Sequence, residues 1–171
     1  MSRVMLVTAM MVAAGLAGCA TAPNAPEALR PPAGQELVLA LQADGVQIYD
    51  CAAAAKGGYE WKFRAPEATL RDVGGKPMGS HYAGPTWRAP DGSTVVAEVR
   101  SKAAAKDPAS IPLLLLSAKS HGDGDGLFSK VSSIQRLDTV GGQAPVNNCA
   151  SAQDLARVAR VPYTATYYFY R

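Results

Sequence analysis

The sequence contains few of the side chains on which enzymes depend. Only 18% of its 171 residues are charged, and it has two histidines and three cysteines. None of its serines lies in a Gly-x-Ser-x-Gly motif, and no strand leads into the glycine-rich turn and helix of a dinucleotide site. The net charge of +3 comes without a block of basic residues, which excludes nucleic acid and a polybasic membrane patch as partners. Whether the protein is an enzyme stays open here, but these absences favour a binding or structural protein.

The apolar run at the N-terminus, residues 4–14, is too short to span a bilayer. It follows Arg3 and precedes small residues, which is the three-part pattern of a secretory signal peptide. The small residues lead to LAGC (16–19), which resembles the lipobox of bacterial lipoproteins. The resemblance implies cleavage before Cys19 and attachment of diacylglycerol and a further acyl chain, such as palmitate, to that residue. We therefore expect residues 1–18 to be a lipoprotein signal peptide; the alternative is an ordinary signal peptide with an incidental cysteine.

The same resemblance implies a location. We expect an exported protein lipid-anchored to the cell envelope, because two or three acyl chains hold a protein on a bilayer where one does not. Ala20 follows the cysteine, whereas Gram-negative lipoproteins retained at the inner membrane commonly carry Asp there, so a Gram-negative source predicts the outer membrane. Loss of residues 1–18 removes one cation and no acid, which lowers the net charge from +3 to +2. Residues 19–34, rich in Pro and Ala, predict a tether, and residues 35–171 a single β domain.

Two cysteines remain after Cys19, namely Cys51 and Cys149. An exported chain folds in an oxidising compartment, so an even pair predicts a disulfide. Two buried free thiols, or one catalytic nucleophile, are the alternatives.

Beyond residue 35 the apolar residues alternate with polar ones and are interrupted by Gly, Pro and Asp, which is typical of strands. Strands are expected in ELVLAL (36–41), VQIYDC (46–51), YEWKFR (59–64), ATLRDV (68–73), HYAGPTW (81–87), STVVAEVR (93–100), SIPLLLLSAKS (110–120), KVSSIQRLDTV (130–140) and YTATYYFYR (163–171). The fold class is therefore all-β, a sandwich or small barrel of about eight to nine short, mostly antiparallel strands.

Four local features refine this prediction. The first two strands should be joined by a turn at Asp44-Gly45, and residues 59–64 should present alternate aromatics to a buried face. The four leucines of residues 113–116 favour a strand buried on both sides. Short helices are possible only at 101–106 and 151–160, and both segments could equally be loops.

The domain resembles domain-of-unknown-function family 3455, found in exported bacterial and fungal proteins. The pieces that carry the resemblance occur in order, and they are GVQIYDC, YEWKFRAPEATL, GKPMGSHYAGPTWRAPDGS, IPLLLLSAKSH, VSSIQRLDTVGGQAP with the second cysteine of the pair, and VPYTATYYFYR. The resemblance implies no activity. Some members are labelled malate dehydrogenase, but without a dinucleotide fingerprint this chain gives that label no support.

The stretch GSHYAGPTW raises the question of a site. One interpretation is structural: Ala-Gly-Pro bends the backbone, Trp87 anchors the core, and His81 bonds to backbone. The alternative is a divalent-metal site in which His81 meets His121, Asp123 and Asp125, since imidazole and carboxylate suit such ions. No other cofactor is indicated.

The sequence thus predicts an envelope lipoprotein of unknown molecular activity that acts as a β-sandwich binding or structural module. Its partners would be a membrane, through the lipid anchor, and an unidentified envelope component or small ligand. Exposed tyrosines such as Tyr82 and Tyr168 would offer a ligand face. The alternative is a metal-binding protein or metal-dependent enzyme that uses His81 and His121.

Overall fold

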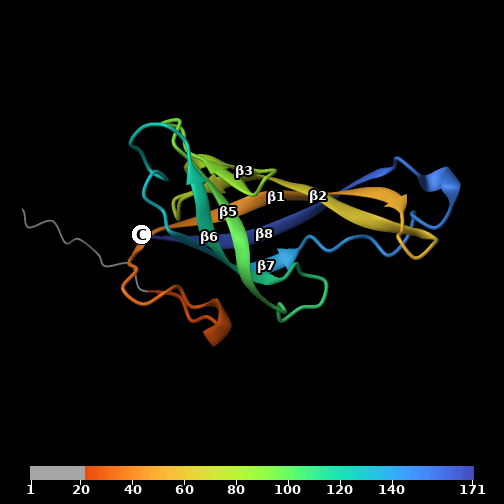
Figure 1. Cartoon of the computed structure of the whole chain (residues 1–171), viewed down its shortest axis with the longest axis horizontal. Helices are drawn as coiled ribbons and strands as arrows, with labels where there is room; N and C mark the ends of the chain where they lie inside the picture. The colour runs from red at the N-terminus through yellow and green to blue at the C-terminus, as the bar shows by residue number, and fades with distance from the viewer. Residues whose placement is uncertain (1–21) are drawn as a thin grey trace, which may run out of the picture.

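Eight antiparallel strands follow one another around a closed barrel, and the first pairs with the last (Figure 1). The structure is a computed structural model that describes residues 22–171, so the predicted signal peptide and Cys19 lie outside the described residues. The strand bounds are β1 Leu37–Ala53, β2 Tyr59–Arg71, β3 Pro77–Tyr82, β4 Thr86–Arg88, β5 Thr94–Ala103, β6 Leu113–His121, β7 Ser133–Gly141 and β8 Val158–Tyr170. The all-β prediction is confirmed, and the architecture is the barrel.

The predicted turn at Asp44-Gly45 is wrong, because β1 runs through it as one strand of 17 residues. Gly45 pairs with Ala68 of β2 on one side and with Tyr163 of β8 on the other. A Cβ at this position would lie 2.1 Å from the carbonyl oxygen of Glu67. The glycine therefore serves close approach of two strands and not chain reversal.

Residues 59–64 and 68–73, predicted as two strands, largely form one strand, β2, which ends at Arg71. A register shift between Ile48 and Tyr49 of β1 places Phe63 opposite the buried Tyr49, as a β-bulge allows. The predicted buried face is only half realised: Tyr59 and Trp61 are partly buried, but Phe63 is 54% exposed where it lines a pocket.

The leucine run is buried on both sides, as predicted. Leu114 and Leu116 pack with the barrel core, whereas Leu113 and Leu115 pack outside it with Leu29. Leu29, which is 0% exposed, belongs to a short 3-10 helix, η1 (Glu27–Leu29). Its carbonyl oxygen accepts a hydrogen bond of 2.6 Å from the buried side chain of Gln135. Part of the predicted tether is thus docked on the barrel wall.

The two possible helices turn out differently. Residues 101–103 end β5, and the rest of 101–106 is a loop. In 151–160, only Ala152–Asp154 is helical (η2, a 3-10 turn), and the carboxylate of Asp154 accepts hydrogen bonds from the backbone N–H and the hydroxyl of Ser151. From Val158 the chain is already β8, because β8 pairs with both β1 and β7 to close the barrel.

A long arm extends from the barrel (to the right in Figure 1), where β1 and β2 continue and the segment before β8 runs beside them. The predicted disulfide is present in the arm: Cys51 and Cys149, with Cα atoms 5.4 Å apart, tie that segment to β1. Closing a loop of 98 residues stabilises the fold by about 4 to 5 kcal/mol on the chain-entropy account.

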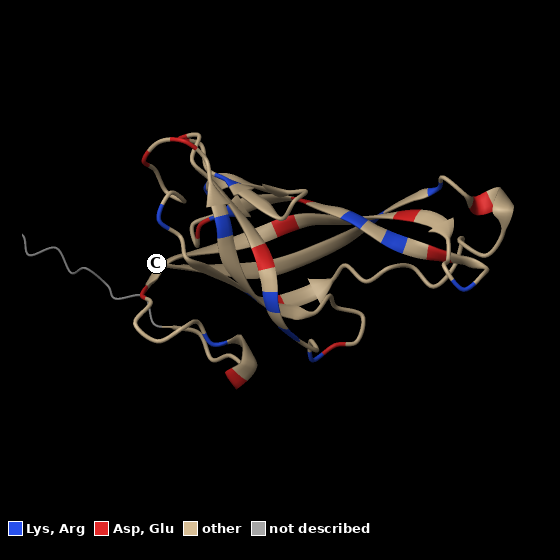
Figure 2. Cartoon of the chain, in the orientation of Figure 1, with Lys and Arg blue, Asp and Glu red and all other residues tan. Residues whose placement is uncertain are grey.

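Charged residues of both signs alternate along the arm in Figure 2. Arg64 binds Asp50 across β1 and β2, and Lys62 lies 3.8 Å from Glu60. Within residues 22–171 no helix is long and apolar enough to cross a membrane.

The two ends of the barrel interior are packed differently. At the end near the C-terminus, Phe128 and Phe169 are fully buried with their rings 4.9 Å apart. Asp91 fixes the loop that carries Phe128, because its carboxylate accepts hydrogen bonds from the backbone N–H groups of Leu127 and Ser93. Aromatic and branched side chains therefore pack the barrel core at this end, and a pocket between the strands lies towards the other end.

Candidate functional site

A pocket of about 270 Å³ lies between strands of the barrel, and we call it the barrel pocket. Its lining residues are Gln47, Phe63, Arg64, Pro66, His81, Gly84, Pro85, Trp87, Val99, Leu114, Leu116, Arg136 and Tyr167. They come from β1 to β8 and from the turn between β3 and β4. The mouth of a small barrel is a usual place for a ligand site.

The stretch GSHYAGPTW builds one wall of this pocket. His81 and Trp87 face each other across β3 and β4, and their rings stack with centroids 4.2 Å apart. Tyr167 of β8 contacts both rings edge-on, at 5.0 Å and 5.4 Å. The Gly84-Pro85 turn, which allows this hairpin, also lines the pocket. The structural interpretation of the stretch is therefore correct, and the same residues line a cavity.

His81 is held as a neutral ring. Its Nδ1 lies 2.9 Å from the carbonyl oxygen of Thr86, so Nδ1 carries the proton and donates. The ring is 3% exposed, and burial lowers its pKa to about 3, with the charge of Arg136 acting in the same direction. Nε2 is consequently unprotonated at neutral pH.

Three buried polar groups of the barrel pocket make no hydrogen bond of normal length and angle within residues 22–171. They are Nε2 of Gln47, Nε1 of Trp87 and the hydroxyl of Tyr167, on side chains at most 2% exposed. The buried hydroxyl of Tyr163 adjoins Gln47 and Tyr167 without completing such a bond. Burial also raises the pKa of Tyr167, so its hydroxyl keeps its proton. All three groups can donate. Buried donors without partners are rare in folded proteins because each costs free energy.

Arg136 adds a positive charge to this pocket. Its Nε and Nη2 donate to the carbonyl oxygen of Pro112 at 3.1 Å and 2.7 Å. Within the described residues, no carboxylate oxygen lies within 4.0 Å of its nitrogens. Arg64, at the same pocket, differs because it binds Asp50.

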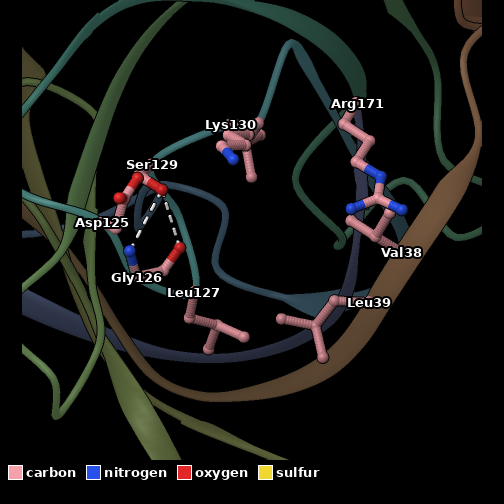
Figure 3. Close-up of a pocket in the computed structure, with 9 residues that line it drawn as sticks. Val38, Leu39, Asp125, Gly126, Leu127, Ser129, Lys130 and Arg171 are labelled. Atoms are coloured by element: carbon pink, nitrogen blue, oxygen red, sulfur yellow. Dashed lines mark hydrogen bonds between the residues drawn. The ribbon is translucent and has the colours of Figure 1, made fainter.

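A second hollow, which we call the terminal hollow, lies at the other end of the barrel. In Figure 3, Leu39 and Leu127 extend towards it from opposite sides, and Lys130 and Arg171 line it further up. Asp125, a predicted site residue, also lines it. None of the unpartnered buried polar atoms belongs to its lining residues. The terminal hollow therefore lacks the donors that distinguish the barrel pocket.

The structure does not bring the predicted metal ligands together. His121 is three strands from His81 through Trp87 and Val95, which is about 14 Å at the usual strand spacing. Its Nε2 lies 2.8 Å from the carbonyl oxygen of Val131. Asp123 and Asp125 are exposed in the loop that follows. Between residues 22 and 171, no three His, Cys, Asp or Glu side chains are placed to hold a metal ion.

The predicted tyrosine face is only partly available. Tyr168 packs against the cluster that contains Leu29, and Tyr82 is 37% exposed at the end of β3. Neither lines the barrel pocket.

The sequence analysis did not identify Gln47, Arg136 or Tyr167 as site residues. One signal was present: Tyr163, Ala165, Tyr167 and Phe169 share a face of β8, and all four are buried. An inward strand face with polar aromatic residues indicates an interior that must satisfy hydroxyl groups. Gln47 and Arg136 carry no such signal, because a polar residue on a strand ordinarily indicates an exposed face.

The model of the family described as "Protein of unknown function (DUF3455)" matches residues 32–171. Neither a curated protein nor a solved structure matches the chain.

Proposed function

The chain belongs to this family, and because its description names no activity, we propose from the barrel pocket that the protein is a binding module for a small molecule. The observation that carries the proposal is the set of buried donors at one cavity that make no hydrogen bond of normal geometry in the described residues. A ligand that accepts hydrogen bonds would offset the free-energy cost of burying those donors. A volume of about 270 Å³ exceeds the roughly 150 Å³ that admits benzene.

We further propose that this module is held at the cell envelope by lipid on Cys19. Support comes from the apolar N-terminal run and LAGC. An envelope protein of this kind would bind its ligand outside the cytoplasm, where a disulfide persists.

A fragment screen by NMR on the isotope-labelled protein tests the binding function. We expect small aromatic and aliphatic fragments to shift the amide signals of pocket residues, above all those of β4 and β8. Val99→Trp should abolish these shifts, because Val99 lines the pocket yet is 51% exposed and so leaves room for a larger side chain outside the core. Glu98→Trp, on the exposed neighbouring position, is the matched control and should keep them.

Two results would contradict the proposal. In one, no fragment binds the wild-type protein. In the other, fragments bind Val99→Trp and the wild type equally well.

A further inference from the structure

We propose that the barrel pocket selects a small apolar molecule that carries a carboxylate, and that the guanidinium of Arg136 recognises this group. The inference rests on the proposed binding function and specifies its ligand class. It follows from the charge, the free donors and the walls of the pocket.

The charge of the pocket is unbalanced. No Asp or Glu is among its lining residues, and its second arginine, Arg64, is already paired with Asp50. Arg136 is partly buried, its two hydrogen bonds of normal geometry in the described chain go to one carbonyl oxygen, and it also interacts with the hydroxyl of Tyr167. Removing a cation from water is unfavourable unless an anion compensates it. A ligand anion would supply that compensation.

The free donors of the pocket match the acceptors of a carboxylate. The bonds to Pro112 use two of the five N–H donors of Arg136, and the other three are shared between the Tyr167 hydroxyl and a ligand. Trp87 adds an N–H donor that no group within residues 22–171 accepts. An ionised carboxylate has about four lone-pair sites and no donor. Charge-assisted bonds of this type are roughly twice as strong as neutral ones.

The rest of the wall is apolar. Phe63, Pro66, Val99, Leu114 and Leu116 line the pocket beside the stacked rings. Together with a volume of about 270 Å³, this favours one ring or a short alkyl chain attached to the acid. A second charged or hydroxylated group on the ligand would be desolvated against these side chains at a cost in free energy.

Calorimetric titration with a matched pair of probes tests the inference. The first probe is 3-phenylpropanoate, and the second is its neutral primary amide, which has the same ring and chain. At neutral pH we expect the acid to bind the wild-type protein about 10- to 100-fold more tightly than the amide. The reason is that hydrogen bonds between a guanidinium and a carboxylate are stronger than those to a neutral amide. This ratio is measured on one folded protein, so it does not depend on how any variant folds.

Variants then assign the preference to Arg136. Arg136→Gln should bring the acid-to-amide ratio close to one while the amide still binds. Arg136→Lys keeps the charge and should retain part of the ratio. Arg100→Gln is the matched control, because the side chain of Arg100 is 62% exposed, pairs with Glu98 and does not line the pocket, and it should leave the ratio unchanged.

The outcomes separate this inference from the proposed function. Equal binding of acid and amide overturns the carboxylate inference and leaves the binding function intact. Binding of neither probe, while other fragments occupy the pocket, overturns the inference as well. A pocket that takes up water and no fragment at all overturns both. A preference for the acid that survives in Arg136→Gln shows that another group recognises the anion, and this contradicts the role of Arg136.

Discussion

His81 illustrates how its surroundings set the chemistry of a single residue. The ring stacks on Trp87 and contacts Tyr167 in an edge-to-face arrangement. Its protonated nitrogen, Nδ1, donates a hydrogen bond to the carbonyl oxygen of Thr86. Arg136 also acts on it electrostatically and opposes a positive charge. An imidazole in this position stacks on Trp87 and donates a hydrogen bond through Nδ1, but it does not serve as a cation near neutral pH.

The buried state of His81 predicts a pH dependence of stability. Its pKa is about 3 in the folded protein and about 6.5 in an unfolded chain. Between these values the unfolded state binds more protons, so the free energy of unfolding falls as pH falls. From pH 7 to pH 5 the loss from this group is about 2 kcal/mol. Carboxyl groups with a lowered pKa, such as Asp91, titrate below this window.

Urea unfolding at pH 7 and pH 5 measures this loss. His81→Asn, which cannot titrate but keeps an N–H for Thr86, should show about 2 kcal/mol less change between the two pH values than the wild type. His121→Asn leaves the buried ring in place and should retain the wild-type difference. If His81→Asn retains it too, the ring is not held neutral as described.

At the scale of elements, Gly45 is the position where β1, β2 and β8 depend most on the absence of a side chain. It pairs with both neighbouring strands. A Cβ would lie 2.1 Å from a backbone oxygen and 2.5 Å from the Cα atom of Ala68. These are backbone atoms, so a rotamer change cannot relieve the overlap.

Gly45→Ala should therefore destabilise the barrel by about 1 to 3 kcal/mol or more, the usual cost of overpacking. Gly74→Ala is the matched control, since the only atom near its added Cβ is a side-chain oxygen of Asp72 at 3.3 Å and no backbone atom lies within 4 Å, and it should change stability by no more than about 0.5 kcal/mol. The free energy of unfolding in urea, compared among the three proteins, gives both values. An equal effect of the two substitutions would show that β1 and β2 do not approach as closely as described.

Gly45 also shows what could not be predicted from the sequence, namely that β1 continues through the Asp44-Gly45 pair. Period-two alternation identified the strand regions because one face of each strand is buried. It could not tell an Asp-Gly turn from an Asp-Gly within a long strand, since the deciding contact is with Glu67, more than twenty residues away. The predicted strands merge into the longer β1 and β2 because these two strands pair with each other, and β1 also pairs with β8, along their length. A local sequence pattern carries no information about this pairing.

The site was predicted to the extent that its residues lie in one hairpin. His81 and Trp87 were identified together because they occupy one short stretch with a bend between them. Gln47, Arg136 and Tyr167 come from three other strands, and only closure of the barrel places them opposite that hairpin. The predicted meeting of His81 and His121 does not occur for the same reason: His81 lies on β3 and His121 on β6, so β4 and β5 separate the two rings.

At the scale of the whole molecule, the two hollows lie towards opposite ends of the barrel. Glu36 and Arg171 bond to each other through their backbones at 3.0 Å and 3.1 Å, so both ends of the strand system meet at the end of the terminal hollow (Figure 1). Gln47 of the barrel pocket follows Leu39 by eight residues of β1, which is about 26 Å along the strand. A chain anchored ahead of residue 22 would thus place the barrel pocket on the side that faces away from the anchor.

This arrangement predicts that anchoring and ligand binding are independent. In a bacterial expression host, Cys19→Ser should abolish labelling by a fatty-acid probe and move the protein from the membrane fraction to the soluble fraction, because on this proposal the acyl chains supply the attachment. The double variant Cys51→Ser and Cys149→Ser is the control and should keep the label, since those two cysteines form the disulfide. The Kd for 3-phenylpropanoate should be the same for Cys19→Ser and for detergent-extracted wild type, because Ala22 lies near Gln35 and Tyr170, at the end of the barrel opposite the barrel pocket. Persistent labelling of Cys19→Ser would contradict the anchor, whereas a changed Kd with lost labelling would show that the anchored end and the pocket are coupled.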